Sequence, residues 1–164
     1  MRRRVVGVMG AGAPRPEHYT AALELGRLVA ERGWVLLTGG LPAGVMAAAC
    51  AGAKQVPGSL TLGILPSASG GEGPDVDIAV FTGMGEARNA INVLSSDVIV
   101  ACGVEGPGTT SEVALALRAG RPVILLGASD EARAFFRGVG RCLEAGSAEE
   151  AVRLVNDQLD RIPD

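Results

Sequence analysis

The chain has 164 residues, about the length of one domain, and a formal net charge of -3 at pH 7, so it lacks the basic excess expected of a nucleic-acid-binding protein. Hydrophobic residues make up 48% of the sequence but aromatic residues only 3%, which predicts a core of small aliphatic side chains among 24 glycines. No run of about 18 apolar residues is present, and we therefore expect no membrane span.

The counts of reactive side chains argue against two kinds of chemistry. Lys54 is the only lysine, so a pyridoxal-phosphate enzyme would have to form its Schiff base on a residue without supporting features. The single His18 excludes a histidine-cluster metal site. Cys50, Cys102 and Cys142 lie far apart, which predicts neither a disulfide framework nor a zinc site and favours a reducing cytoplasm.

The first segment predicts a strand, a glycine turn and a helix. Val5–Met9 is a short apolar run, and a helix is expected over residues 16–32. Between them, Gly10 and Gly12 form a G-x-G pattern, which is a weak dinucleotide-binding motif; a tight turn without a ligand explains it equally well. We interpret His18 as a solvated residue of the first helical turn, with ligand contact as the alternative.

A second strand is predicted over residues 34–38, followed by a helix of small residues that ends near Lys54. Gly39 and Gly40 stand directly after the strand, and Gly44 stands before the helix. A double glycine after a buried strand indicates a close backbone approach, either by a ligand or by a neighbouring loop.

The middle of the chain predicts two further strands and a helix. Residues 60–65 form the third strand, and residues 67–74 form a polar, glycine-containing loop that is either a lid or a mobile loop without function. A fourth strand follows over residues 77–81. The next helix, over residues 85–95, carries Arg88 and Asn89 in its early turns, and from the sequence alone Arg88 is either a functional residue or an ordinary surface arginine.

A strand, loop, helix and strand unit occupies residues 97–126. The apolar runs Val98–Cys102 and Val123–Leu126 predict two buried strands. Thr109 and Glu112 have the spacing T-x-x-E, which predicts a capping box at the helix start, and Gly120 ends that helix.

The start of this helix is a candidate anion site. The first helical turn has unpaired N–H groups and the positive end of the helix dipole, and it is approached through Gly106 and Gly108, which have no side chain to block a ligand. Thr109 and Thr110 add hydroxyl groups. In an open α/β sheet, such a site ordinarily holds a phosphate group.

Towards the end of the chain we expect a short helix over residues 132–137, a last strand over residues 139–143, and a final helix opened by a second capping box at Ser147–Glu150. Strands and helices alternate throughout. The sequence therefore predicts a single α/β domain over residues 1–164, with a three-layer, Rossmann-like fold: a mostly parallel sheet of six or seven strands with helices on both faces.

Three segments resemble a known family. They are GGLPAGVMAAACAGA at 39–53, GMGEARNAINVLSSDVIV at 83–100, and GPGTTSE at 106–112 followed by RPVILL. Together they resemble the Rossmann-like superfamily of the Lonely Guy cytokinin-activating phosphoribohydrolases, whose members also carry the label "possible lysine decarboxylases". The single lysine disfavours that last activity.

The resemblance implies a pocket for a nucleoside 5'-monophosphate or a similar phosphorylated compound, with no metal and no required cofactor. In the hydrolases an arginine and a glutamate act on the N-glycosidic bond, and these match Arg88 and Glu112. The implied ligand-binding residues are Gly10, Gly12, Gly39, Gly40, Gly44, Met84, Arg88, Asn89, Gly106, Gly108, Thr109, Thr110 and Glu112.

Two departures from the hydrolases point to a subgroup. In the family pattern P-G-G-x-G-T-x-x-E, Val104 and Glu105 replace the proline and the first glycine, and Glu105 would repel a phosphate if it pointed inward. Asn89 replaces the lysine of an arginine-lysine pair. These features resemble the compact branch that includes the molybdenum-cofactor carrier proteins, which hold a pterin monophosphate without processing it.

Two functional hypotheses follow. The first is a cytoplasmic carrier of a phosphorylated, nucleotide-like or molybdopterin-type ligand, and the second is a phosphoribohydrolase that releases a free base and ribose 5-phosphate. For both, the expected partner is a phosphorylated small molecule, with neither nucleic acid nor membrane. The resemblance also suggests a homodimer or higher homo-oligomer, with the helix of Arg88 near its interface.

Overall fold

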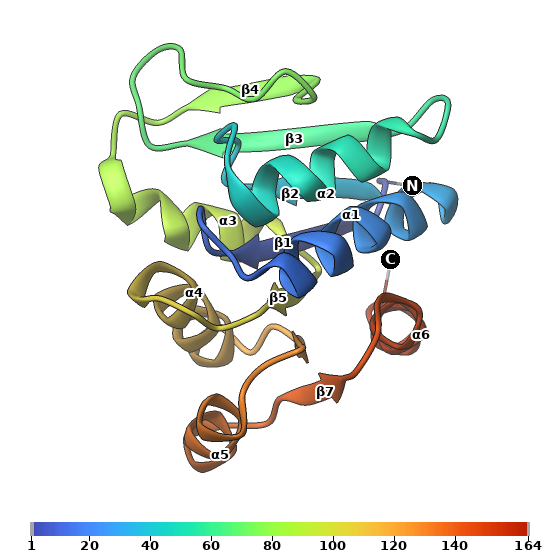
Figure 1. The fold of residues 1–164 in the computed structure, drawn as a ribbon, viewed down its shortest axis with the longest axis vertical. Coiled ribbons are helices and arrows are strands. Elements are labelled where there is room, and N and C mark those ends of the chain that lie inside the picture. The colour runs from blue at the N-terminus through green and yellow to red at the C-terminus, as the bar shows by residue number, and fades with distance from the viewer. Residues whose placement is uncertain (1, 164) are drawn as a thin grey trace.

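The computed structural model describes residues 2–163, and its seven strands form one parallel sheet (Figure 1). Helices connect the strands along most of the chain. The strand order is β4-β3-β2-β1-β5-β6-β7. This confirms the predicted α/β class. The elements, in chain order, are β1 (Val5–Gly10), α1 (Pro16–Glu31), β2 (Val35–Thr38), α2 (Gly44–Lys54), β3 (Leu60–Leu65), β4 (Ile78–Phe81), the 3-10 turn η1 (Gly85–Arg88), α3 (Asn89–Ser95), β5 (Val98–Cys102), α4 (Pro107–Arg118), β6 (Val123–Leu126), α5 (Asp130–Val139), β7 (Leu143–Ala145) and α6 (Ala148–Leu159).

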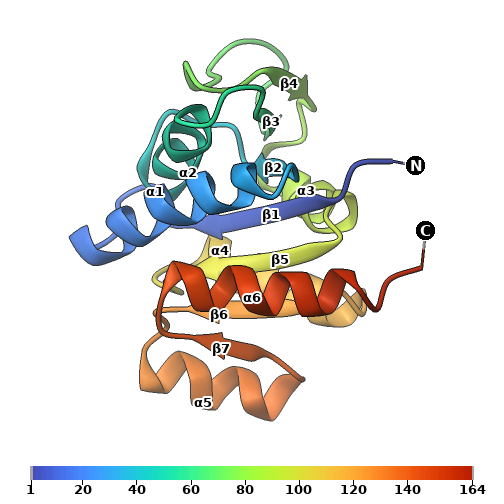
Figure 2. The same ribbon diagram turned by 90° about the vertical axis from the view of Figure 1, so that its right-hand side faces the viewer.

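The sheet is covered on both faces, which gives the three layers seen in Figure 2. Helices α1, α2 and α6 pack on one face, and α3, α4 and α5 pack on the other. Small residues allow α1 and α2 to touch backbone to backbone: a Cβ on Gly26 would lie 1.9 Å from Ala49 O, and one on Gly52 would lie 1.8 Å from Leu23 O. The glycine- and alanine-rich composition thus has a packing role.

The strand order reverses direction between β1 and β5. From β1 the chain moves through β2 and β3 to β4, and it then returns to add β5, β6 and β7 on the other side of β1. The loops that follow β1 and β5 therefore diverge, and they leave a crevice at the carboxyl ends of these strands. A ligand site is expected there in any open sheet of this type.

The predicted start of the helix that follows β5 is wrong. Helix α4 begins at Pro107 with Gly106 as its N-cap, so Thr109 lies inside the helix and no side chain caps its start. The Glu112 side chain instead accepts a hydrogen bond from Asn92. Proline at the first helical position with an extended residue before it is a competing start signal, and it prevails over the T-x-x-E spacing.

The end of the chain also differs from the prediction. Helix α5 runs from Asp130 to Val139, and the last strand is Leu143–Ala145, so residues 139–142 are not a strand. Ser129 caps α5 by accepting a hydrogen bond from the Ala132 N–H, a start signal that the sequence interpretation missed. The predicted capping residue Ser147 does accept the Glu150 N–H at the start of α6.

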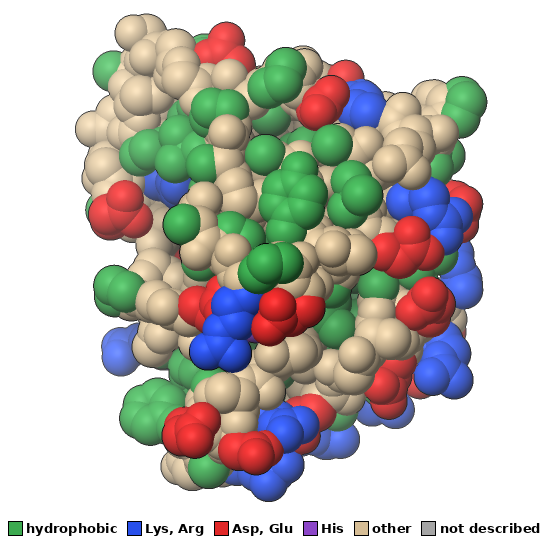
Figure 3. All heavy atoms as spheres, in the orientation of Figure 1, with side chains coloured by type: hydrophobic (Ala, Val, Ile, Leu, Met, Phe, Trp, Pro, Cys, Tyr) green, Lys and Arg blue, Asp and Glu red, His purple; other side chains and the backbone are tan. Residues whose placement is uncertain are grey.

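The surface carries a mixture of both charge types. Figure 3 shows acidic and basic side chains interspersed on the face turned to the viewer, with an uncharged area of apolar side chains and main chain at its centre and upper left. Within residues 2–163, no helix is both long and apolar enough to cross a membrane.

Candidate functional site

A pocket of about 320 Å³ lies at the carboxyl ends of β1 and β2, beside the start of α4. We call it the glycine pocket. It brings together nine of the predicted site residues: Gly10, Gly12, Gly39, Arg88, Asn89, Gly106, Gly108, Thr109 and Glu112. The pocket is also lined by Val8, Met9, Ala11, Leu41, Met46, Glu86 and Pro107.

The start of α4 presents two free amide groups at this pocket. The Gly106 carbonyl accepts the Thr110 N–H at 3.1 Å, and Pro107 has no N–H to offer. The N–H groups of Gly108 and Thr109, at the second and third helical positions, donate to no acceptor among residues 2–163. They stand at the positive end of the helix dipole, where an anion is stabilised by both effects.

The glycines of the pocket fall into two groups. A Cβ on Gly10 would lie 2.6 Å from Val45, and one on Gly39 would lie 2.7 Å from the Arg88 guanidinium, so packing requires these two glycines. In contrast, a Cβ on Gly106 or Gly108 would meet no atom within 4 Å, and neither residue has a positive φ. Nothing within the described chain explains these two glycines, which leave the approach to α4 open.

Arg88 provides a buried cation beside the amides. Arg88 is the last residue of η1 and is only 5% exposed, and its Nη1 donates to Asn89 Oδ1 at 2.9 Å. Its Nε has no hydrogen-bond partner among the described residues. A buried guanidinium N–H without a partner is rare in folded proteins, because it loses its bond to water and gains nothing in return. This N–H group is therefore free to donate to a ligand bound in the pocket.

Glu112 lies close to Arg88 in the wall of the same pocket. Its Oε1 accepts a hydrogen bond from Asn92 Nδ2 at 2.8 Å and lies 3.8 Å from Arg88 Nη1. Burial raises the pKa of Glu112 above its ordinary value, an effect that the Asn92 hydrogen bond and the Arg88 charge offset only in part. The glutamate thus combines an electrostatic contact with a tendency to hold its proton.

A chain of hydrogen bonds joins Arg88 to the first turn of α4. Asn89, which accepts from Arg88, donates from Nδ2 to Ser111 Oγ at 3.2 Å, and Ser111 Oγ donates to Gly108 O at 2.7 Å. The asparagine that replaces the lysine of the hydrolases therefore couples the buried arginine to the helix start. It positions neighbouring groups where a lysine would add a positive charge.

The other four predicted residues lie outside the pocket lining. Gly40 and Gly44 both have a positive φ, and a Cβ on Gly44 would lie 2.2 Å from the Ala11 carbonyl oxygen, in the loop that follows β1. Thr110 Oγ1 donates to Gly106 O, within its own helix start. Met84 is 51% exposed on the surface. For the two glycines and Thr110, the structure therefore supplies local reasons that need no ligand.

Sequence reasoning missed Asn92, which is fully buried and holds Glu112 in place. A signal for it does exist, because Arg88, Asn92 and Ser96 are spaced four residues apart, as polar residues on one side of a helix are. Met46 and Glu86 were missed as well. Nothing in their sequence context points to a pocket.

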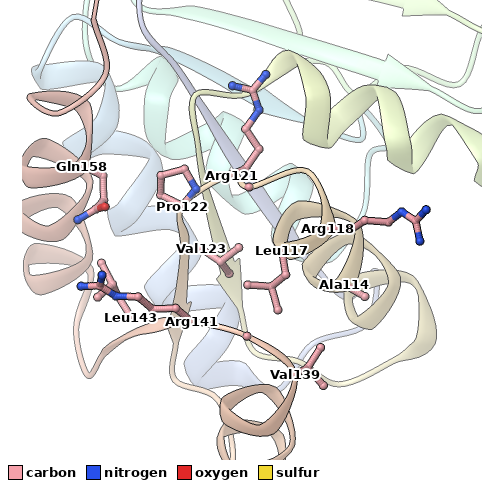
Figure 4. A pocket seen from close by; sticks show the side chains of 12 residues that line it. Ala114, Leu117, Arg118, Arg121, Pro122, Val123, Val139, Arg141, Leu143 and Gln158 are labelled. Atoms are coloured by element: carbon pink, nitrogen blue, oxygen red, sulfur yellow. The ribbon is translucent and has the colours of Figure 1, made fainter.

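A larger hollow, of about 520 Å³, lies at the opposite edge of the sheet, where β6 and β7 begin. We call it the arginine hollow, and its labelled lining in Figure 4 includes Leu117, Arg118, Arg121, Val123 and Arg141. The three arginine side chains point in three different directions, away from the apolar floor. They do not converge on a common position, as the groups of an anion site would have to do.

Known proteins share both the sequence and the fold of this chain. The sequence model of the SLOG cluster4 family matches residues 3–152. The chain belongs to the SLOG cluster4 family. An uncharacterised protein of Archaeoglobus fulgidus is 44% identical over 126 residues, which cover 77% of this chain and 82% of that protein.

Solved structures place this SLOG cluster4 protein beside molybdenum-cofactor proteins. The molybdenum cofactor binding protein of Rippkaea orientalis is 47% identical, with a TM-score of 0.92 over 97% of this chain and 99% of that one. The Moco carrier protein of Chlamydomonas reinhardtii is 43% identical, with a TM-score of 0.92 over 98% of this chain and 100% of that one. These similarities confirm the expected Lonely Guy-like superfamily and its compact branch.

Proposed function

We propose that this protein binds and carries the molybdenum cofactor or a closely related pterin phosphate in the glycine pocket. The observation that carries the proposal is the pair of free amides, Gly108 and Thr109, facing a pocket that also contains the unpartnered Arg88 Nε. An anionic phosphate satisfies all of these donors. The similarity to two proteins described as binding or carrying this cofactor supports the identity of the ligand.

The chemistry of the pocket fits such a ligand. The phosphate group would lie at the amides of α4, where Gly106 and Gly108 leave space for it. Arg88 donates to oxygen atoms of the ligand, and the Glu112 carboxyl can pair with polar groups of a pterin ring. The apolar Met9 and Met46, which line the same pocket, suit the flat faces of a heterocycle.

A loading experiment tests the carrier function. Cofactor extracted under nitrogen from a purified molybdoenzyme is mixed with the protein, free cofactor is removed by gel filtration, and bound pterin is measured by fluorescence after oxidation. We expect about one pterin per chain, recovered without chemical change. No retained pterin, or a pterin altered by the protein, would contradict the proposal.

A second candidate function rests on Arg88 and Glu112, whose charged groups approach to 3.8 Å at the pocket wall. In a phosphoribohydrolase, loss of the base leaves positive charge on the sugar, which a carboxylate such as Glu112 can stabilise while Arg88 holds polar groups of the substrate. Incubation with AMP and related monophosphates tests it. Absence of free base, or equal rates in the native protein and in Glu112→Gln, would remove this candidate.

We also propose that the protein works in the reducing cytoplasm and, from its family resemblance, that it forms a homo-oligomer. Cys50 and Cys102 are buried as free thiols, and burial raises the pKa of both, so neither forms a thiolate readily. Light scattering coupled to size-exclusion chromatography tests the assembly. A mass equal to one chain at all concentrations would contradict it.

A further inference from the structure

Glu105 lies in the loop that leads from β5 to α4, one residue before Gly106. An acidic side chain at this place is expected to oppose an anion, yet the structure turns it away from the glycine pocket, whose lining does not include it. Its Oε1 lies 3.0 Å from Arg15 Nε, and its Oε2 lies 3.1 Å from His18 Nδ1. The Arg15 N–H also donates to Oε2 at 3.3 Å.

His18 is buried, so its interpretation as a solvated residue is wrong. It is 8% exposed, and its Nε2 donates to Gly127 O, at the end of β6, at 3.0 Å. The ring fits between Gly103 and Gly127, where a Cβ would approach it to 2.4 Å and 3.3 Å. Cys102 Sγ donates to the His18 carbonyl at 3.3 Å. The first turn of α1 is thus fixed to the ends of β5 and β6.

Glu105 connects this fixed point to the loop before α4. Burial alone would raise its pKa, but the contact with His18 and the bond and charge of Arg15 outweigh that effect and hold the pKa of Glu105 below its ordinary value. The carboxylate is therefore ionised at neutral pH. Because His18 Nε2 donates to a carbonyl, its Nδ1 can donate to Glu105 only when both ring nitrogens carry a proton. The loop is otherwise held at its two ends, where the Gly103 N–H donates to Leu126 O at 2.9 Å and Gly106 O accepts the Thr110 N–H, and Glu105 adds a side-chain anchor between them.

We propose that Glu105 is a positioning residue, which, with Arg15 and His18, holds the loop so that the amides of Gly108 and Thr109 face the glycine pocket. The inference rests on the proposed function of that pocket. A loop that is ordered before the ligand arrives loses less conformational entropy on binding, so the brace increases affinity without touching the ligand. The contacts with Arg15 and His18 also hold the negatively charged Glu105 side chain outside the pocket, where it does not repel the phosphate.

The proposal predicts an effect opposite in sign to simple electrostatics. Glu105→Gln removes one negative charge near the anion site, which by charge alone strengthens anion binding. If the brace dominates, affinity for the extracted cofactor falls by roughly fivefold, because Glu105 acts only through the ordering of the loop and does not bond to the ligand. The affinity of Glu105→Ala should be lower than that of Glu105→Gln, because the glutamine can still accept a hydrogen bond from the Arg15 N–H and alanine cannot. An unchanged or increased affinity in Glu105→Gln overturns the proposal.

Two further variants sharpen this test. Glu17→Gln removes a negative charge from the same turn of α1 as His18, but Glu17 is exposed and makes no contact with Glu105, so it shows the effect of charge alone. His18→Gln acts through the same brace. The double variant of Glu105 and His18 should therefore bind the cofactor with about the same affinity as whichever single variant binds it less tightly. Fully additive losses would contradict a shared brace.

A measurement without ligand keeps the brace separate from the proposed function. The Thr110 N–H donates to Gly106 O and so reports on the loop and the helix start. Its hydrogen exchange should be severalfold faster in Glu105→Gln than in the native protein, and unchanged in Glu17→Gln. If the native protein binds no cofactor, the proposed function fails, and equal Thr110 exchange in both proteins would overturn the brace itself.

Discussion

The two edges of the sheet differ in what they offer a ligand. At the carboxyl edge, the glycine pocket has a volume of about 320 Å³ and contains free amides and a buried arginine. At the amino edge, the arginine hollow is larger, about 520 Å³, but its arginines diverge around an apolar floor (Figure 4). Volume does not distinguish the two edges, because a second hollow at the carboxyl edge, lined by His18 and Glu105 among others, has about 540 Å³.

The direction of the helices accounts for the difference. All seven strands are parallel, and α4 starts at the carboxyl edge and ends at the amino edge, beside the arginine hollow. Its free N–H groups and positive dipole end therefore face the glycine pocket, and its last carbonyl groups face the hollow. Arginines near the carboxyl-terminal ends of helices have an ordinary structural role, because they donate to the last carbonyl groups. Arg121, for example, donates to Leu94 O near the end of α3.

Substitution of Arg88 should cause the largest difference in cofactor affinity between variants at the two edges. Arg88→Met keeps an apolar chain of similar length and removes the buried guanidinium, which should weaken cofactor binding roughly 10- to 100-fold, as for hydrogen bonds to a charged group. Arg118→Met, in the arginine hollow, is the matched control and should change affinity less than about twofold. Equilibrium binding of extracted cofactor measures both, and equal losses would break the comparison.

Asp97, at the amino edge, should matter for stability and not for binding. Its side chain is 2% exposed and accepts hydrogen bonds from Arg2 and from the Val5 N–H. Burial disfavours the ionised form, but these bonds and the charges of Arg2 and Arg4 hold the pKa of Asp97 below its ordinary value. Asp97→Asn should therefore lower the free energy of unfolding by about 1 to 3 kcal/mol at pH 7.

The pH dependence of this effect has a definite sign. A carboxyl group whose pKa is lowered by folding contributes stability that is present above its unfolded pKa, about 3.9, and is lost as pH falls through its folded pKa. The difference between native protein and Asp97→Asn in urea unfolding should shrink below about pH 4. Asp157→Asn, an exposed change on α6, should show no such trend. A constant difference down to low pH would contradict the assignment.

Much of the fold could be predicted because its strands are short apolar runs bounded by glycine or proline. The structure has Leu60–Leu65, Val98–Cys102 and Val123–Leu126 as predicted. The start of α4 could not be predicted as easily, because Pro107 and the T-x-x-E spacing give two signals two residues apart. A capping box needs the Glu112 side chain at the start of the helix, but this side chain accepts a hydrogen bond from Asn92 instead.

The site was predictable in its backbone and less so in its side chains. Gly106 and Gly108 follow from local sequence, although the predicted helix start is Thr109 and not Pro107, and Arg88 and Glu112 came from the family resemblance. The direction of Glu105 depends on Arg15, 90 residues away in the sequence, and the burial of His18 depends on Gly127. Such contacts leave no periodic pattern, so only the tertiary structure reveals them.

Gly108→Val tests the open approach to α4 against the other edge. A Cβ at this position meets nothing within 4 Å, so the valine should fit the folded protein and occupy the space of the anion. We expect roughly tenfold weaker cofactor binding, or about 1.4 kcal/mol. Ala114→Val adds the same branched bulk to the same helix, in the arginine hollow, and should leave affinity unchanged. Calorimetry measures both, and similar affinities in the two variants would show that Gly108 does not face the ligand.

The smallest expected effect concerns Glu112, the carboxyl-edge counterpart of Asp97, and it has the opposite sign. Burial raises the pKa of Glu112, so the folded state holds its proton more tightly than the unfolded state does. Stability is then lost as pH rises from the unfolded pKa, about 4.3, through the folded pKa. Glu112→Gln, which cannot ionise, should gain stability relative to native protein over that range, by about 1 kcal/mol or less. A shift in favour of the native protein would mean that Arg88 stabilises an ionised Glu112 more than burial opposes it, and the two edges would then hold their carboxylates in the same way.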